Sequence, residues 1–281
     1  MACERPAQRA QPLSRYSLGD LQRVVSQEAA VGPISRSTLW RLLDRDVLKP
    51  WRYRLWIFPR DPAFAVKAGR VLDLYAGWWE GAPLGPDEYV LSADEKTSIQ
   101  ARCRCHPGRP PRPGHSQQVE FEYERRGAVQ YLAAWDVRRG LVFGRCEAHT
   151  GCEPFGRLVE QVMSQAPYRS AARVFWLVDN GSSHRGAAAS RRLHGAYRNL
   201  ILVHLPLHAS WLNQIEIYFS IIQRKVLTPN DFADCTAVAD RLRAFEQRTN
   251  AAPRPFAWRF TRAELERRLR ERDPTLLPTA A

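Results

Sequence analysis

Apolar residues recur at helical spacing in the N-terminal part of the chain, over residues 14–60. The first run extends from Leu18 to Val25, and the pair Gly32-Pro33 then interrupts it. Ser35 is placed to cap a second helix. The inward-facing residues expected in that helix are Leu39, Leu42 and Leu43. The pattern predicts two short helices joined by a tight turn that contains glycine.

The outer face of the second helix is basic, which is typical of a helix-turn-helix. From Trp51 to Trp56 aromatic and basic residues alternate, which suits contact with a sugar-phosphate backbone but also fits a strand with one buried face. A helical hairpin with solvated arginines is the alternative for the whole segment. The residues expected to contact DNA are Arg36, Ser37, Trp40, Arg41, Arg45, Arg52 and Arg54.

From residue 87 the pattern becomes strand-like. Tyr89–Ala93 is a short apolar strand, and Val119–Glu124, Ala128–Trp135 and Leu141–Cys146 alternate as in an antiparallel meander with turns at 126–127 and 139–140. Further strands are expected at 174–178 and 200–203, and helices at 153–166, 185–197, from about 210, 231–249 and 261–272. This order predicts an α/β fold with a mixed sheet flanked by helices.

The charge of the chain favours a polyanionic partner. Lysine and arginine total 42 against 29 acids, a net charge of +13, and residues 1–70 hold 13 of these bases and 6 of the acids. Neutralising phosphates releases condensed counterions, so nucleic acid is the expected partner. No apolar run approaches the roughly 20 residues that span a bilayer, and no signal peptide is evident, so we expect a cytoplasmic, nucleoid-associated protein without membrane contact.

The cysteine pattern does not indicate a structural zinc site. The nearest approach is Cys103-Arg-Cys-His106, which has no second ligand pair at zinc spacing. We therefore expect free thiols in a basic loop.

Three carboxylates stand out by position. Asp94 and Asp179 each follow an apolar strand, and Glu216 lies at the edge of the packed face of a helix. Open α/β sheets bind ligands just beyond such strand ends. Carboxylates suit Mg²⁺, and two such ions can activate a water or a 3′-hydroxyl. Taken singly, each acid is equally explained as a turn former or a salt-bridge partner.

Three segments together resemble a known family. They are 91–100 (LSADEKTSIQ), 177–184 (LVDNGSSH) and 210–216 (SWLNQIE). They look like bacterial insertion-sequence transposases of the mariner-like DDE superfamily, in which an Asp after the first strand, a D-N-x-x-x-H segment and an S-x-x-N-x-x-E segment occur in this order. Asp179 and Glu216 are 37 positions apart, which fits the short final interval of that family.

The resemblance implies an RNase H-like catalytic domain preceded by a small helical helix-turn-helix domain, and two Mg²⁺ or Mn²⁺ ions. Asp94, Asp179 and Glu216 would be the catalytic metal ligands. Supporting positions would be His184, Asn213 and Asn180, whereas His204 and His208 are expected to be structural. Glu95 and Asp136 are the alternatives for the first ligand, and alternation places Glu95 on the opposite face if the strand continues.

The domains expected are a helix-turn-helix region over 1–60, a connecting helix and linker over 61–86, the catalytic domain over 87–250 and a basic helical tail over 251–281. The first is expected to be incomplete, because family members usually carry two helix-turn-helix units. The implied reaction is cut-and-paste transposition, with terminal inverted repeats and target DNA as partners and a homodimer on DNA. An RNase H-like nuclease without strand transfer, or a truncated DNA-binding remnant, are the alternatives.

Overall fold

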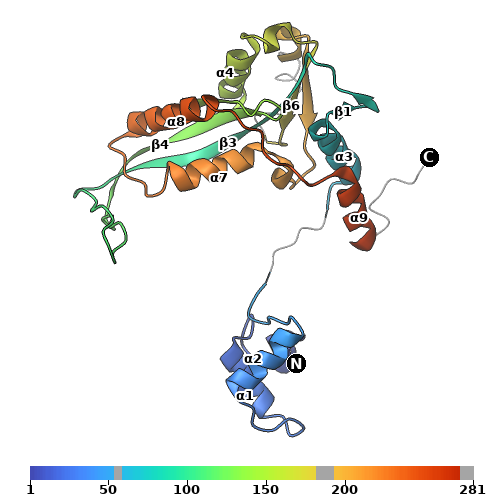
Figure 1. The fold of residues 1–281 in the computed structure, drawn as a ribbon, viewed down its shortest axis with the longest axis vertical. Coiled ribbons are helices and arrows are strands. Elements are labelled where there is room, and N and C mark those ends of the chain that lie inside the picture. Colours follow the sequence, from blue (N-terminus) through green and yellow to red (C-terminus); the bar gives the residue numbers. More distant parts are fainter. Residues whose placement is uncertain (54–58, 182–192, 273–281) are drawn as a thin grey trace. The chain divides into compact units, whose positions relative to one another are not determined.

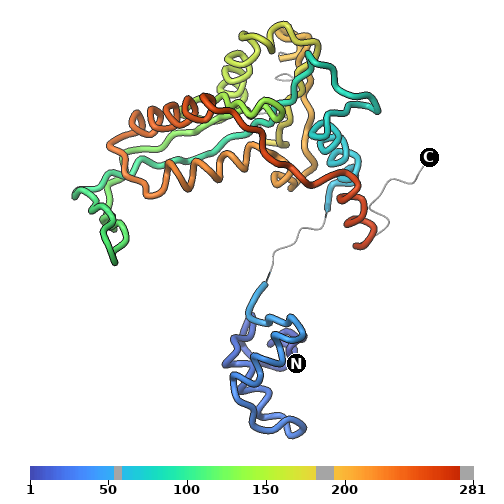
Figure 2. The backbone as a smooth tube through the Cα atoms, viewed as in Figure 1, coloured from blue at the N-terminus to red at the C-terminus, as the bar shows by residue number. Residues whose placement is uncertain are grey.

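The chain forms two compact units, which are described separately. The computed structural model describes residues 1–53, 59–181 and 193–272 (Figures 1 and 2). The units are Met1–Phe58 and Pro59–Ala281. No helix in the described ranges has the length and apolar character that a bilayer crossing requires.

The smaller unit is built on two helices, α1 (Leu18–Ser26) and α2 (Arg36–Arg45), after a 3-10 turn η1 (Pro6–Arg9). Each helix begins at a serine whose side chain accepts a backbone N–H, which satisfies one of the donors exposed at a helix start. The small core consists of Tyr16, Leu21, Leu39 and Leu43.

Two details of this unit differ from the sequence prediction. The connection between the helices is not a tight turn, since it runs from Gln27 to Ser35. Its end is held against α1 by a 2.9 Å hydrogen bond from Gln22 to the Ile34 carbonyl oxygen. Leu42 is 43% exposed rather than buried. In this small core only Leu39 and Leu43 of α2 are buried, and Leu42 lies outside it.

The larger unit contains a five-stranded sheet in the order β5-β4-β3-β6-β7. The strands β3 (Glu88–Cys103), β4 (Glu124–Asp136) and β5 (Val142–Glu147) are antiparallel. The strands β6 (Arg173–Val178) and β7 (Leu200–His204) run parallel to β3. The prediction of a mixed sheet with flanking helices is confirmed.

The meander was predicted with one strand too many. Residues 119–123 form no strand, and 126–127 lie inside β4 rather than in a turn. Gly127 has a positive φ of 96° where the pairing of β3 with β4 shifts between Gln100 and Arg102. A bulge of this kind needs such a residue, so the glycine that suggested a turn instead bends one long strand.

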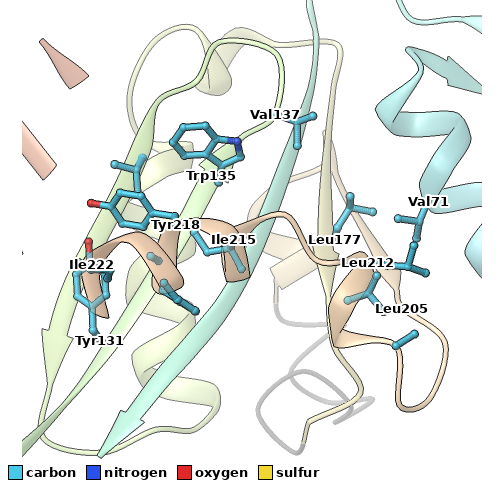
Figure 3. Packing of buried hydrophobic residues seen from close by; sticks show 14 of the residues in the cluster. Val71, Tyr131, Trp135, Val137, Leu177, Leu205, Leu212, Ile215, Tyr218 and Ile222 are labelled. Atoms are coloured by element: carbon cyan, nitrogen blue, oxygen red, sulfur yellow. The ribbon is translucent and has the colours of Figure 1, made fainter. Parts of the chain in front are cut away.

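Helices cover both faces of the sheet. One face packs against α3 (Phe64–Tyr75), α7 (Ile215–Lys225), α8 (Cys235–Asn250) and α9 (Arg262–Arg272), and Figure 3 shows part of this cluster. The other face packs against α4 (Cys152–Met163). Shorter elements are β1 (Trp78–Trp79), β2 (Ala82–Pro83), η2 (Tyr168–Ser170) and η3 (Ser210–Leu212).

The helix α3, which was expected to be a connector, contributes several side chains to this core, including Val71 and Leu74. The expected linker at 81–86 includes strand β2, which pairs with β1 in a small hairpin. Residues 61–86 therefore belong structurally to the larger unit.

The packing of β5 on β4 leaves no room for a side chain at Gly144. A Cβ atom there would lie 2.1 Å from the hydroxyl oxygen of the buried Tyr131. We expect Gly144→Ala to lower the free energy of unfolding by about 1–3 kcal/mol, measured by denaturant titration. Gly195→Ala is the control, since nothing lies within 4 Å of its added Cβ. Equal stability of the two variants would contradict this packing.

Candidate active site

Asp94 and Asp179 lie at the same level on neighbouring parallel strands. The last paired residues of β3 and β6 are Ser92 and Leu177, and each aspartate follows two residues later. Parallel strands lie about 4.8 Å apart, and residues two apart share a face, so both side chains belong to the face covered by α7. The sequence placed Asp94 at a strand end, but β3 continues to Cys103 because β4 pairs with it beyond the end of β6.

Glu216 is the second residue of α7, on the same face of the sheet. The buried side of the helix carries Ile215, Tyr218, Phe219 and Ile222, whereas Glu216 is on its exposed side. This placement fits the predicted position at the edge of the packed stripe.

A buried hydrogen-bond network ties the start of α7 to β3. The Ser92 hydroxyl donates to the Asn213 side-chain oxygen and accepts the Ile215 backbone N–H at 3.0 Å. The Asn213 amide donates to the Ala93 carbonyl oxygen at 3.0 Å and to the Asp94 carboxylate at 3.1 Å. Asn213 thus orients Asp94 directly while fixing the helix that carries Glu216.

Tyr75 on α3 adds a second support at the same helix start. Its hydroxyl donates to the Leu212 carbonyl oxygen at 2.7 Å and accepts the Gln214 N–H at 3.3 Å. These backbone groups precede the regular helix and would otherwise lack partners.

The turn after β6 holds the Asp179 carboxylate close to the backbone. Its Oδ1 atom accepts the Gly181 N–H at 2.7 Å, and a Cβ atom on Gly181 would lie 2.8 Å from that oxygen. The Asn180 amide donates to the Leu205 carbonyl oxygen. His204 lies 3.4 Å from the Asp179 carbonyl oxygen through Nδ1.

The charges of Asp179 and Glu216 affect the pKa of Asp94, and the charge of Asp179 affects the pKa of Glu216. Burial, and then repulsion from Asp179 and Glu216, raises the pKa of Asp94 to about 7, although a hydrogen bond from the Glu95 N–H opposes the shift. The pKa of Glu216 is also raised, first by the partial exclusion of solvent and then by Asp179, whereas Lys96 lowers it. Each repulsion favours a neutralising cation between the groups.

The donor set fits a hard divalent cation in kind, because carboxylate oxygens are its preferred protein ligands. In the described residues, however, no three His, Cys, Asp or Glu side chains are gathered so that they could hold an ion as they stand. Joint metal ligation by Asp94, Asp179 and Glu216 therefore stays a prediction.

The two alternative candidates for the first metal ligand, Asp136 and Glu95, have other positions in the structure. Asp136 is fully buried; its carboxylate accepts the Arg138 and Arg139 N–H groups at 3.1 and 2.9 Å and the Tyr168 hydroxyl at 2.7 Å. It therefore shapes the β4–β5 turn. Glu95 pairs with Leu132, and alternation places it on the face opposite Asp94.

Other predicted residues are less closely connected with this site. His184 and Arg54 lie outside the described residues. His208 is exposed and has a positive φ of 58°, and the cysteines of the described chain are free thiols. The DNA-contact candidates that the structure describes are all exposed in the smaller unit: Arg36, Ser37, Trp40, Arg41, Arg45 and Arg52.

Sequence reasoning overlooked Ser92, Tyr75 and Lys96. Ser92 left a usable signal, since it is the one polar residue in the otherwise apolar run from Tyr89 to Ala93. Tyr75 and Lys96 left none, because their roles depend on contacts between elements distant in sequence.

The five-stranded mixed sheet in the order β5-β4-β3-β6-β7, with helices on both faces, is the arrangement of an RNase H-like fold. Residues 89–238 match the family model of the DDE superfamily endonucleases, which is more than half of the chain, so the chain belongs to that family. No curated protein matches the sequence.

Among solved structures, the chain is similar to the Mos1 mariner paired end complex with Mn. The TM-score is 0.54 at 16% identity, over 85% of this chain and 73% of that chain, which shows a shared fold. The Mos1 strand transfer complex matches with a TM-score of 0.48 at 13% identity, over 87% and 73% of the two chains. A pre-cleavage Mos1 transpososome matches with 0.46 at 12%, over 95% and 78%.

The raised pKa of Asp94 gives a pH dependence of stability. The folded chain binds this proton more tightly than the unfolded chain, so without metal the carboxyl destabilises the fold as the pH rises from about 4 to about 7. In EDTA, we expect Asp94→Asn to raise the free energy of unfolding at pH 8 by on the order of 1 kcal/mol, and not at pH 4. Denaturant titration at both pH values measures this, with Glu122→Gln as the exposed control. An Asp94→Asn effect independent of pH would count against it.

Proposed function

We propose that this chain is a mariner-like DDE transposase, of the type found in bacterial insertion sequences, that cuts DNA at element ends and joins the freed 3′-hydroxyl to target DNA. The observation that carries the proposal is the position of Asp94 on β3 and of Asp179 directly after the adjacent parallel strand β6, with Glu216 on the helix above the same face. Membership of the DDE superfamily supports phosphodiester chemistry at these acids. The Mos1 structure that shares the fold is a paired end complex, which supports DNA ends as substrates.

In the proposed site, Asp94, Asp179 and Glu216 would hold Mg²⁺ or Mn²⁺, two ions in all. Bound there, such ions neutralise the phosphate and make a water or 3′-hydroxyl more acidic. Asn213 keeps one Asp94 oxygen fixed through its amide, and the Gly181 N–H does the same for Asp179. Fixing the acids in advance lowers the cost of assembling the charged site.

The proposed division of labour places end recognition in residues 1–60 and catalysis in 87–250, with 61–86 and 251–281 as flanking segments. The exposed arginines of α2 would contact the terminal inverted repeats. Joining requires two ends in one complex, so we propose a homodimer on DNA, acting in the nucleoid.

The first test removes the charge of each acid. We expect Asp94→Asn, Asp179→Asn and Glu216→Gln each to reduce cleavage and joining by at least about 1000-fold, because each removes a metal ligand. The substrate is a duplex carrying the inverted repeats that flank the gene, incubated with target plasmid and Mn²⁺. Duplex binding should persist.

Glu95→Gln is the matched control, since it removes a neighbouring charge on the other face of β3. Nicks without joined products from the parent protein would indicate a nuclease. Duplex binding with neither product would indicate a DNA-binding remnant, and either result would refute transposition.

The second test concerns the smaller unit. We expect Arg41→Ala with Arg45→Ala to weaken binding of the end duplex roughly tenfold and to reduce its salt dependence by about 0.9 in log–log slope for each lost phosphate contact. Fluorescence anisotropy at several salt concentrations measures both. Arg23→Ala is the control, an exposed arginine of α1 paired with Asp20. Equal losses in control and test variants would remove α2 as the contact surface.

A further inference from the structure

A cavity of about 610 Å³ lies between α7, α8 and the segment after α8, within the size range of ligand pockets. Its α7 residues include Ile221 and Lys225. At 100° per residue these lie on the side of the helix opposite Glu216, so the cavity is separate from the three acids.

One wall of the cavity is a run of aromatic rings. Trp135 stacks on Phe256 at 4.2 Å between centroids with an interplanar angle of 18°. Tyr218 follows Trp135 at 6.1 Å and 24°, and Phe245 follows Tyr218 at 6.2 Å and 30°. Figure 3 shows Trp135 and Tyr218 side by side. Phe245 and Phe256 remain half-exposed, so a flat ligand could extend the stack.

Positive charge surrounds these rings. Lys225, Arg241, Arg248 and Arg254 line the cavity, and no carboxylate is found among its described lining residues. None of the four forms an ion pair with a described residue, although the Arg241 guanidinium lies over the Phe232 ring. Asp240, the residue before Arg241, pairs with Arg243 at 2.9 Å, and Glu246 lines a different cavity beside α8. The four cations are therefore available to a ligand.

The walls are held in place by backbone contacts. The Asn250 side chain, at the end of α8, donates to the Val142 carbonyl oxygen at 2.7 Å and accepts the Val142 N–H at 2.9 Å. The backbone at Arg254 and Pro255 packs so closely on Gly140 that a Cβ there would lie within 2.4 Å. The buried Trp135 ring also retains an indole N–H that has no partner in the described chain. The contacts of Asn250 and Gly140 fix the segment that carries Arg254 and Phe256 against the β4–β5 connection.

We propose that this cavity binds an unpaired nucleotide of single-stranded DNA, with the base added to the ring stack and adjoining phosphates on Arg248 and Arg254. Stacking on aromatic side chains beside a basic groove is how proteins hold single strands without reading sequence. The choice of DNA over another aromatic anion rests on the proposed function, which generates free strand ends. An acidic, tyrosine-rich peptide has similar chemistry and is tested as the competitor.

The test measures binding alone, in EDTA, by anisotropy of a fluorescein-labelled single-stranded hexathymidylate. We expect it to bind at least about tenfold more tightly than a hexamer of abasic sites with the same phosphates. Ala244→Trp should abolish this difference, since Ala244 is an exposed residue that lines the cavity and the change leaves the charge intact. Ala252→Trp, beyond the end of α8, fills the same cavity if the first variant does not fold.

The phosphate contacts are tested by Arg248→Gln with Arg254→Gln. This variant should weaken binding and lower the log–log salt slope by about 0.7 per lost contact. Arg169→Gln with Arg198→Gln is the charge-matched control, since both are exposed and neither lines the cavity.

Three results would overturn the proposal: equal affinity for the thymidylate and abasic hexamers, unchanged binding in the Trp variants, or tighter binding of an acidic tyrosine-containing peptide of equal charge. Because EDTA excludes catalysis, a chain that binds the hexamer but joins no ends would refute the proposed function and leave this inference intact. A chain that joins DNA ends but binds the thymidylate and abasic hexamers equally would refute this inference and leave the proposed function intact.

Discussion

The geometry of the candidate site depends on the hydrogen bonds between Ser92 and Asn213. Both side chains are essentially excluded from solvent, and a buried polar group left without a partner costs about 1–3 kcal/mol. That penalty fixes the start of α7 against one point of β3. The position of Glu216 relative to Asp94 follows from it, because Glu216 is only three positions after Asn213 in the chain.

The sheet concentrates negative charge in a chain that is otherwise strongly basic. Asp94 and Asp179 sit where the parallel pairing of β3 with β6 ends, and that is where two side chains can share a face without a helix covering them completely. Burial, and then repulsion from Asp179 and Glu216, raises the pKa of Asp94 to about 7. Without a bound cation, a carboxylate in this setting therefore reduces the stability of the fold at neutral pH.

The sequence predicted the elements better than their connections. Continuous apolar runs located β6 and β7, and the serine before α2 located the start of that helix. The glycine in β4 was misleading, since a positive φ serves a bulge as readily as a turn. The length of β3 was missed because its distal half is polar and is held by pairing with β4. Pairing of this kind joins residues far apart in sequence and leaves no local pattern.

The same distinction holds for the site. Position relative to strands and motif order selected Asp94, Asp179, Glu216 and Asn213, and the fold brings these segments to one face of the sheet. The supports from Ser92 and Tyr75 required knowledge of which helix crosses which strand. The aromatic and basic cavity beside α8 was equally invisible, since its residues come from β4, α7, α8 and the segment that follows.

The packing of α9 on α3 joins the two ends of the larger unit. Leu265 and Leu269 enter the same core as Val71 and Leu74, and Arg262 pairs with Asp73 at 2.6 Å. During synthesis, the apolar face of α3, the first described helix of this unit, is therefore covered only after α9 has been made. A ribosome that stops before residue 262 would release a chain with every acid of the candidate site but an open core, exposed to proteases and to aggregation.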